Sequence, residues 1–271
     1  MSEVQNEKDE AEFPKKQLES VFLHSLRLMD QDREYLQMHL KKVSDERTEA
    51  AFSDMELESA RLERTIRELM ELSAPEEALK KRPVDLCGIL AELERMAPEI
   101  QRQNGTTLQV DRGGMDQCLV WADREKAEQL CFHLLSNALR AVSPGGTVWV
   151  HLRRTEQNFA LTIEDDGCGL PEGESWLENR RRFLGGARAG LPLCRKYCRQ
   201  LGWTLELSNR AAGGACAALT VPLPARAFPI EPVVEFRSEM EGPVSTPLQR
   251  QLRRELYLLT TRRNGAEHGL C

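Results

Sequence analysis

The sequence lacks any uninterrupted apolar run of the roughly 18 to 20 residues that a membrane-spanning helix requires. Its first residues, MSEVQNEKDEAEF, are acidic and polar, whereas a secretory signal peptide is basic and then apolar. It also lacks a basic surplus, because 37 Lys and Arg stand against 43 Asp and Glu, a net charge of −6 in 271 residues. These absences argue against membrane insertion and against nucleic acid as a partner, and they predict a soluble, cytoplasmic protein.

The eight cysteines include no CxxC pair. The closest two, Cys194 and Cys198, are four residues apart, and no second Cys or His cluster stands at metal-ligand spacing. We therefore expect reduced thiols that act as small core residues, and no zinc site.

Changes in composition divide the chain into four parts. We expect residues 1–15 to be disordered and residues 16–80 to form two long helices. Residues 81–224 alternate short strands with helices, and residues 225–271 begin with a Pro-rich connector and end in an amphipathic helix.

Two heptad-spaced patterns of apolar residues lie within residues 16–73. Only a short segment, VSDERTEA, separates them, so we expect an antiparallel helical hairpin. One hairpin buries only part of each apolar seam, and we therefore predict a homodimer in which two hairpins form a four-helix bundle. The two seams comprise Leu18, Phe22, Leu26, Met29, Leu36, Leu40 and Val43, then Phe52, Met55, Leu62, Ile66 and Leu69.

The alternation of strands and helices in the central part predicts an α/β sandwich with helices on one face of a mixed sheet. Together with the N-terminal helices, this gives an expected fold class of α+β for the whole chain. Helical periodicity runs over residues 84–101, 123–142 and 190–201. The expected strands are LQV, CLVWA, TVWVHL, FALTIE, TLELS and CAALTV.

A final helix is predicted from Ser245 or Thr246, which would cap it, and Pro247 suits its first turn. Its apolar face carries Leu248, Leu252, Leu256 and Leu259. Two interpretations stay open: the helix docks on the protein's own core, or it binds a partner.

Three short motifs stand in an informative order: HLLSNALR at 133–140, EDDGCGLP at 164–171 and GGARAGLPLCRKYC at 185–198. An Asn on a helix, a strand that ends in Asp-x-Gly-x-Gly, and a Gly-rich turn that opens another helix are together typical of a nucleotide pocket.

On these motifs, residues 18–224 resemble the sensor histidine kinases, members of the GHKL superfamily of ATP-binding domains. The resemblance implies a GHKL-type catalytic domain over residues 81–224 that binds ATP and Mg²⁺. It also implies a dimerisation and phosphoacceptor hairpin over residues 16–80, and a response regulator protein as partner.

The resemblance places Mg²⁺ on Asn137, whose side-chain oxygen is a hard neutral ligand. Arg140 is one turn further along the helix and either meets phosphate or is a solvated surface residue. Asp165 is implied to accept a hydrogen bond from the amino group of adenine, while Gly167 and Gly169 let the base approach the backbone.

Gly186 and Gly190 bracket the turn into the helix at 190–201, whose N-terminal amides suit a triphosphate. In this turn Arg188 replaces a family Gly, and Ala189 replaces a family Leu. Arg188 could add a phosphate contact. His133 stands where hydrolytic members of the superfamily place a Glu, so we expect no water-activating carboxylate.

His24 is the candidate phosphoacceptor, because HSLR matches part of the family motif HELRTP and the heptad places His24 on the outer face of the bundle. Ser25 replaces the acidic neighbour that would accept the imidazole proton, a loss of roughly 10²–10⁴ in rate. His24 could instead be an ordinary solvent-facing residue.

The resemblance implies an ATP-binding protein that phosphorylates its own His24 and relays the phosphoryl group to a response regulator. Two alternatives remain: a dimeric regulatory module with impaired catalysis, and a GHKL kinase that phosphorylates serine on a partner. The departures at Ser25, His133, Arg188 and Ala189 favour the module, and the complete hairpin argues against the serine kinase.

Overall fold

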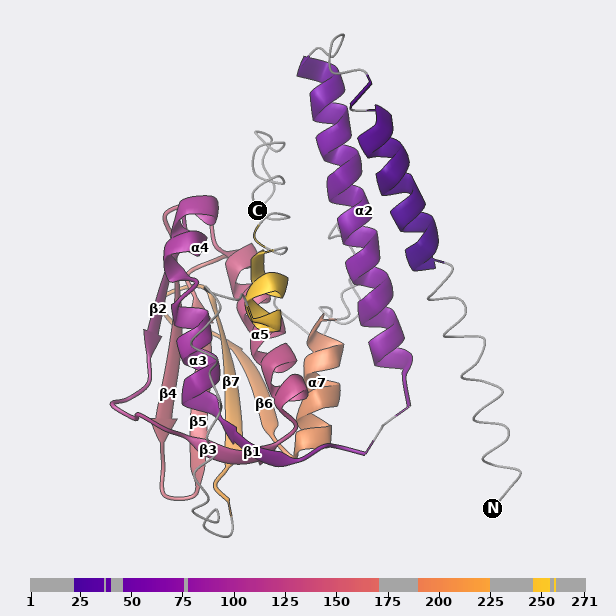
Figure 1. The fold of residues 1–271 in the computed structure, drawn as a ribbon. Coiled ribbons are helices and arrows are strands. Elements are labelled where there is room, and N and C mark those ends of the chain that lie inside the picture. The colour runs from indigo at the N-terminus through magenta and orange to yellow at the C-terminus, as the bar shows by residue number, and fades with distance from the viewer. Residues whose placement is uncertain are drawn as a thin grey trace, which may run out of the picture. The chain divides into compact units, whose positions relative to one another are not determined.

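The protein is described from a computed structural model that places residues 22–36, 38–39, 46–75, 78–170, 190–224, 246–253 and 256 (Figure 1). Two compact units are present. One contains both N-terminal helices, and the other contains the strands and the remaining helices. The N-terminal residues 1–15 and the connector over 225–245 lie outside the described residues.

The first unit contains a helix over residues 22–36 and 38–39, and the 28-residue helix α2 (Glu46–Ser73). Ion pairs between successive turns support α2, such as Arg64 Nε to Glu68 Oε1 at 2.6 Å. The apolar seam is only partly covered within one chain. Leu26 and Phe52 are buried, whereas the side chains of Phe22 and Leu62 are 51% and 49% exposed.

The second unit is built on a five-stranded mixed sheet in the order β2-β4-β5-β7-β6. Strands β2 and β4 are parallel, and every other neighbouring pair is antiparallel. The strands are β2 (Thr107–Asp111), β4 (Thr147–Arg154), β5 (Asn158–Asp165), β6 (Thr204–Asn209) and β7 (Ala215–Pro222). This arrangement confirms the predicted α+β class with a mixed sheet.

Alternation of side chains along the strands supplies the apolar face of this sheet. Val148, Val150 and Leu152 of β4 are fully buried, and so is Leu161 of β5. Helices α3 (Leu86–Glu94), α4 (Ala97–Asn104), α5 (Arg124–Ala141) and α7 (Gly190–Leu201) contribute the other side of the core. Ile89, Ile100, Leu135 and Leu193 are among their buried residues.

The continuous helix expected over residues 84–101 is wrong. Residues 82–85 instead form β1 (Arg82–Asp85), which pairs with β3 (Leu119–Ala122) in a separate two-stranded sheet. Asp85 caps α3, because its Oδ1 accepts a hydrogen bond from the amide of Cys87 at 3.0 Å. A turn at Arg95 and Met96 then separates α3 from α4, which has Pro98 in its first turn, where a missing N–H costs nothing.

A further helix over residues 247–253 packs in the same unit as the sheet. Leu248, Leu252 and Leu256 are buried. The side chains of Gln129 on α5 and Gln251 exchange two hydrogen bonds, of 2.8 and 3.0 Å. Of the two interpretations of this helix, the structure has the first, docking on the protein's own core.

Seven cysteines of the described part of the chain are free thiols, and five of them are buried. Burial raises the pKa of the Cys131 thiol to about 12, which keeps it protonated. No helix in the described ranges is long and apolar enough to cross a bilayer.

Candidate functional site at the ends of α5, β5 and α7

Helix α5 carries the first motif and begins at a strong cap. Oδ1 of Asp123 accepts hydrogen bonds from the amides of Glu125 and Lys126, at 3.1 and 3.4 Å. In the last part of the same helix, Asn137 lies half-buried. Its Nδ2 atom is buried and has no hydrogen-bond partner within the described residues. A polar atom left in this way needs a partner from outside the described protein atoms.

Gly190, the first residue of α7, lies directly against this part of α5. A Cβ atom on Gly190 would stand 3.8 Å from Oδ1 of Asn137 and 3.7 Å from Nδ1 of His133. Helix α7 has no acidic residue in its first turn, so its N-terminal amides and positive dipole are not neutralised there. The third motif therefore brings a helix N-terminus to Asn137.

Asp165 ends β5 and is 4% exposed. Its Oδ1 accepts hydrogen bonds from the amides of Gly167 at 2.9 Å and Ala215 at 3.2 Å. Both bonds go to one oxygen, so Oδ2 is left for a further donor. Burial raises the pKa of the Asp165 carboxyl, and the two amide hydrogen bonds offset part of that effect.

The loop after Asp165 is tied to the end of α5 by a close backbone contact. A Cβ on Gly167 would collide with the carbonyl group of Ala141, the last residue of α5, so only glycine fits there. Gly169 has a φ of +74°, a conformation that favours glycine. The first two motifs therefore meet at Ala141, one turn beyond Asn137.

Of the other predicted pocket residues, Arg140 lies half-buried in the last turn of α5. Gly186 and Arg188 lie outside the described residues. His133 is buried, with its ring 5.4 Å from Phe132 and 6.5 Å from Tyr197 between centroids. A ring enclosed in this way is poorly placed to activate a water molecule.

His24 belongs to the other compact unit. It is exposed on the helix over residues 22–36, and Ser25 beside it is exposed as well. His39, the second histidine of that unit, is also exposed, and its Nδ1 lies 2.8 Å from the carbonyl oxygen of Tyr35.

Two residues that the sequence analysis did not single out, Asn209 and Arg210, contact the Asp165 loop. Nη1 of Arg210 donates to the carbonyl oxygen of Asp165 at 2.8 Å, and the side chain of Asn209 bonds to the backbone of Leu170. The sequence signal is weak, because an Asn-Arg pair before a Gly-Gly turn predicts a hairpin but not what the hairpin touches.

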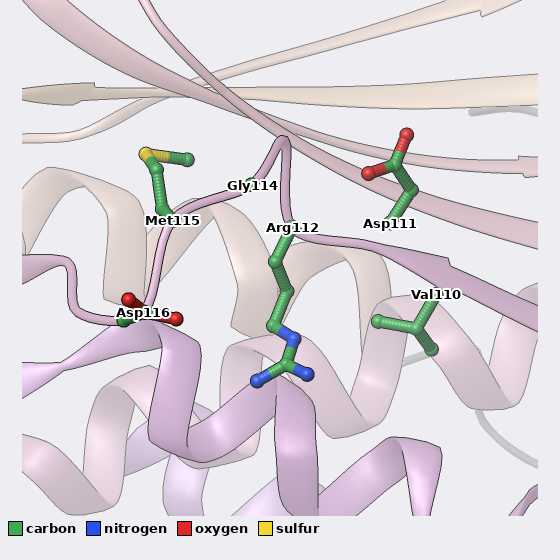
Figure 2. A pocket seen from close by; sticks show the side chains of 6 residues that line it. All are labelled: Val110, Asp111, Arg112, Gly114, Met115 and Asp116. Atoms are coloured by element: carbon green, nitrogen blue, oxygen red, sulfur yellow. The ribbon is translucent and has the colours of Figure 1, made fainter.

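A shallow depression of about 320 Å³ lies elsewhere in this unit, after β2 (Figure 2). The strand register places it at the opposite end of the sheet from the site. Gly113, in the loop after β2, lies against Leu152 and Arg153 near the end of β4, whereas Asp165 pairs with Val148 near the start of β4. Figure 2 shows Asp111 and Arg112 pointing to opposite sides. The residues that line the depression are Val110, Asp111, Arg112, Gly114, Met115 and Asp116.

Comparison with known proteins finds relatives of the sheet unit. Residues 122–225 match the family described as histidine kinase-, DNA gyrase B- and HSP90-like ATPase. The circadian input-output histidine kinase CikA of Synechococcus elongatus is 26% identical over 177 residues, which cover 62% of this chain and 24% of CikA. The adaptive-response sensory kinase SasA of Prochlorococcus marinus is 34% identical over 113 residues, covering 38% of this chain and 30% of SasA. The matched segments thus span less than a third of either kinase.

Among solved structures, the histidine kinase ThkA in complex with the response regulator protein TrrA has a similar fold. The TM-score is 0.54 at 21% identity, and the match covers 76% of this chain and 61% of that chain. Residues 122–225, which contain Asn137, Asp165 and Gly190, therefore match the histidine kinase-, DNA gyrase B- and HSP90-like ATPase family and are similar in sequence to segments of histidine kinases.

Proposed function

We propose that the chain is a cytoplasmic, dimeric histidine kinase that binds ATP with Mg²⁺, phosphorylates its own His24, and passes the phosphoryl group to a response regulator. One observation carries the proposal. The Asp165 loop and the N-terminus of α7 both meet the last turns of α5. The carboxylate of Asp165, the side-chain amide of Asn137 and the positive dipole at the start of α7 therefore lie together, and these are groups that can bind a nucleotide.

Asp165 forms the adenine end of the proposed site. Its Oδ1 is engaged by two backbone amides, which fixes the plane of the carboxylate. The ionised Oδ2 then accepts a hydrogen bond from the 6-amino group of the base. Glycine at 167 lets the loop pack against the carbonyl group of Ala141, and glycine at 169 allows a positive φ beside Asn209, so both fix the course of the loop that carries Asp165.

Asn137 and α7 form the phosphate end. No group of three or more His, Cys, Asp or Glu able to hold a metal occurs among the described residues, so a bound Mg²⁺ would share phosphate oxygens, water and one neutral ligand. Asn137 fits that role, because its Oδ1, a hard neutral ligand, faces Gly190 at the start of α7. Its Nδ2, which has no hydrogen-bond partner among the described residues, would donate to a phosphate oxygen. Mg²⁺ would supply charge neutralisation for the phosphates. Arg140, Gly186, Arg188 and Gly190 complete the proposed phosphate-binding set.

His24 is the proposed acceptor. The lone pair of its neutral Nε2 forms a bond to the γ-phosphorus of ATP, the bond from that phosphorus to the bridging oxygen breaks, and ADP leaves. The imidazole proton passes to water, because Ser25 cannot accept it. We therefore expect slow turnover in comparison with a kinase that has a carboxylate at this position.

Two protein partners are proposed, a response regulator and a second copy of the chain. The similar kinase ThkA forms a complex with the response regulator protein TrrA, and this supports an equivalent partner here. The half-exposed Phe22, Met29, Leu62 and Leu69 support a second copy of the chain, because a bundle of four helices would cover them.

A dimeric regulatory module that binds nucleotide without stable phosphorylation is the alternative. The exposed Ser25 beside His24 favours it, since the site lacks the base that would deprotonate the imidazole.

The test is incubation of the purified chain with γ-labelled ATP and Mg²⁺, followed by assay for label that survives base and is lost in acid. We expect such label on the wild type, and none on His24→Gln or Asn137→Ala. His39→Gln is the matched control, because His39 is exposed in the same unit and should leave labelling intact. Nucleotide binding without any label would support the regulatory module instead.

A further inference from the structure

The turn between β6 and β7 reaches across to the end of β5 through Arg210. Nε of Arg210 donates to Oε2 of Glu164 at 2.9 Å, and Nη1 donates to the carbonyl oxygen of Asp165 at 2.8 Å. The guanidinium also lies over the ring of Trp149 on β4, 4.5 Å from its centroid. These contacts come from different directions, so they hold the planar guanidinium in one orientation.

The same turn is closed on itself around Arg210. The amide of Arg210 donates to the carbonyl oxygen of Gly214 at 2.9 Å, and the amide of Gly213 donates to the carbonyl oxygen of Arg210 at 3.1 Å. Nη1 of Arg210 also donates to the carbonyl oxygen of Gly213 at 3.2 Å. Arg210 therefore links a closed turn, rather than a loose loop, to Asp165.

Asn209 holds the far end of the Asp165 loop. Its Oδ1 accepts from the amide of Leu170 at 2.6 Å, and its Nδ2 donates to the carbonyl oxygen of Leu170 at 3.0 Å. This reciprocal pair acts as an additional rung between the turn and the loop. The contact is close, since a Cβ on Gly169 would lie 2.9 Å from Oδ1 of Asn209.

Gly214 and Ala215 complete the contact with Asp165. A Cβ on Gly214 would collide with the carbonyl oxygen of Asp165, and the amide of Ala215 donates to Oδ1 of the Asp165 side chain at 3.2 Å. The orientation of the carboxylate thus depends on the place of the β6–β7 turn, which Asn209 and Arg210 fix against the loop.

We propose that Asn209 and Arg210 are positioning residues that aim the free oxygen of Asp165 at the 6-amino group of adenine. The inference rests on the proposed nucleotide site. The hydrogen bonds of the two side chains within the described residues go to Leu170, Glu164, Asp165 and Gly213, and none goes to Asn137 or to α7, so neither substitution should affect how the phosphates are held.

ATP and ITP test this inference together, because they share ribose and phosphates, and ITP carries a carbonyl oxygen in place of the amino group. Affinities are measured for the full chain with Mg²⁺ by calorimetry. We expect the wild type to prefer ATP by about tenfold or more, the effect of one hydrogen bond to a charged group. Arg210→Ala and Asn209→Ala should each lower this preference at least threefold, with the affinity for ITP changed less than twofold.

Arg210→Lys keeps the charge but cannot reach Glu164 and the Asp165 carbonyl together, so we expect an intermediate preference. Arg153→Ala is the matched control, since Arg153 pairs with Asp111 at the opposite end of the sheet and should leave the preference unchanged.

Parallel loss of both affinities, with the preference intact, would overturn the inference, because it would mean that the turn only stabilises the fold. An unchanged preference in both alanine variants would overturn it too, while the proposed function would stand. A wild type that binds neither nucleotide, or both equally, would overturn the adenine contact and this inference with it. If Arg210→Ala does not fold, the change in preference is measured on Asn209→Ala alone, with the same expected and contradicting results.

Discussion

The hydroxyl of Thr246 donates a hydrogen bond of 2.7 Å to Oε2 of Glu92, across 154 positions of the chain. Glu92 is buried on α3 and also pairs with Arg124 at the start of α5, at 3.3 Å. The same Thr246 oxygen accepts a hydrogen bond from the amide of Gln249 at 3.2 Å, while Oε1 of Gln249 accepts one from the amide of Thr246 at 3.3 Å. Thr246 thus caps its own helix and attaches it to the sheet unit.

This double role predicts that Thr246→Val destabilises the sheet unit by about 1 to 3 kcal/mol. Valine keeps the shape of the side chain but removes the cap and leaves the buried Glu92 with one partner fewer. Thr246→Ser retains the hydroxyl and should stay within about 0.5 kcal/mol of the wild type. Thermal and denaturant unfolding measure both variants, and equal midpoints for the two would contradict the role of the hydroxyl.

The leucines on the apolar face of the same helix should contribute more to the stability of the unit than the Thr246 hydroxyl does. Leu252 is fully buried, so Leu252→Ala removes buried methyl groups and is expected to cost about 2 to 5 kcal/mol. Arg250, exposed on the same helix, supplies the control: Arg250→Ala should change stability by less than about 0.5 kcal/mol. If the two variants unfold alike, the helix does not stabilise the unit through its leucines.

Asp165 predicts a pH dependence of stability. Burial raises the pKa of its carboxyl in the folded state above the ordinary value of 3.8, so the stability it contributes is present below that value and is lost as pH rises through the raised pKa. Asp165→Asn avoids that loss. We expect the variant to unfold at a higher temperature than the wild type at pH 7, and the difference to shrink on acidification. A difference that is constant with pH would contradict this account.

The half-exposed apolar residues on the helices over 22–36 and α2 predict that the unit containing these two helices self-associates. Leu62→Glu places a charge on a half-exposed apolar position of α2 and should shift the chain from dimer to monomer in light scattering. Gln31→Glu introduces the same carboxylate at an exposed polar position of the same unit and should leave the dimer intact. A wild type that is monomeric at every concentration measured would contradict the dimer.

Much of the second unit could be predicted from local patterns. The alternation along β4 and β5 identified two central strands, because one side of each strand is buried in the core. The order of the three motifs indicated a nucleotide pocket, and Asn137, Asp165 and Gly190 all lie at the ends of elements that the periodicity had already indicated.

The rest depended on contacts between distant parts of the chain. Strand β1 has four residues and a proline, too few to show a period, and it exists because Val84 pairs with Val120. The contacts that Asn209 and Arg210 make with the Asp165 loop follow from the register of β6, β7 and β5. This register places the β6–β7 turn against Asp165, about 45 positions away in the sequence. No local pattern encodes that register.

The central claim is that Asp165 and Asn137 mark the two ends of a site for an adenine nucleotide. Calorimetry of Asp165→Asn with ATP and ITP, both with Mg²⁺, tests it most directly. The substitution replaces the free acceptor oxygen by an N–H₂ donor. This donor cannot bond to the amino group of adenine, which is also a donor, but it can donate to the carbonyl oxygen of hypoxanthine, the base of ITP. We predict that the variant prefers ITP while the wild type prefers ATP. Unchanged preference for ATP in the variant would contradict the assignment of Asp165 and with it the proposed pocket.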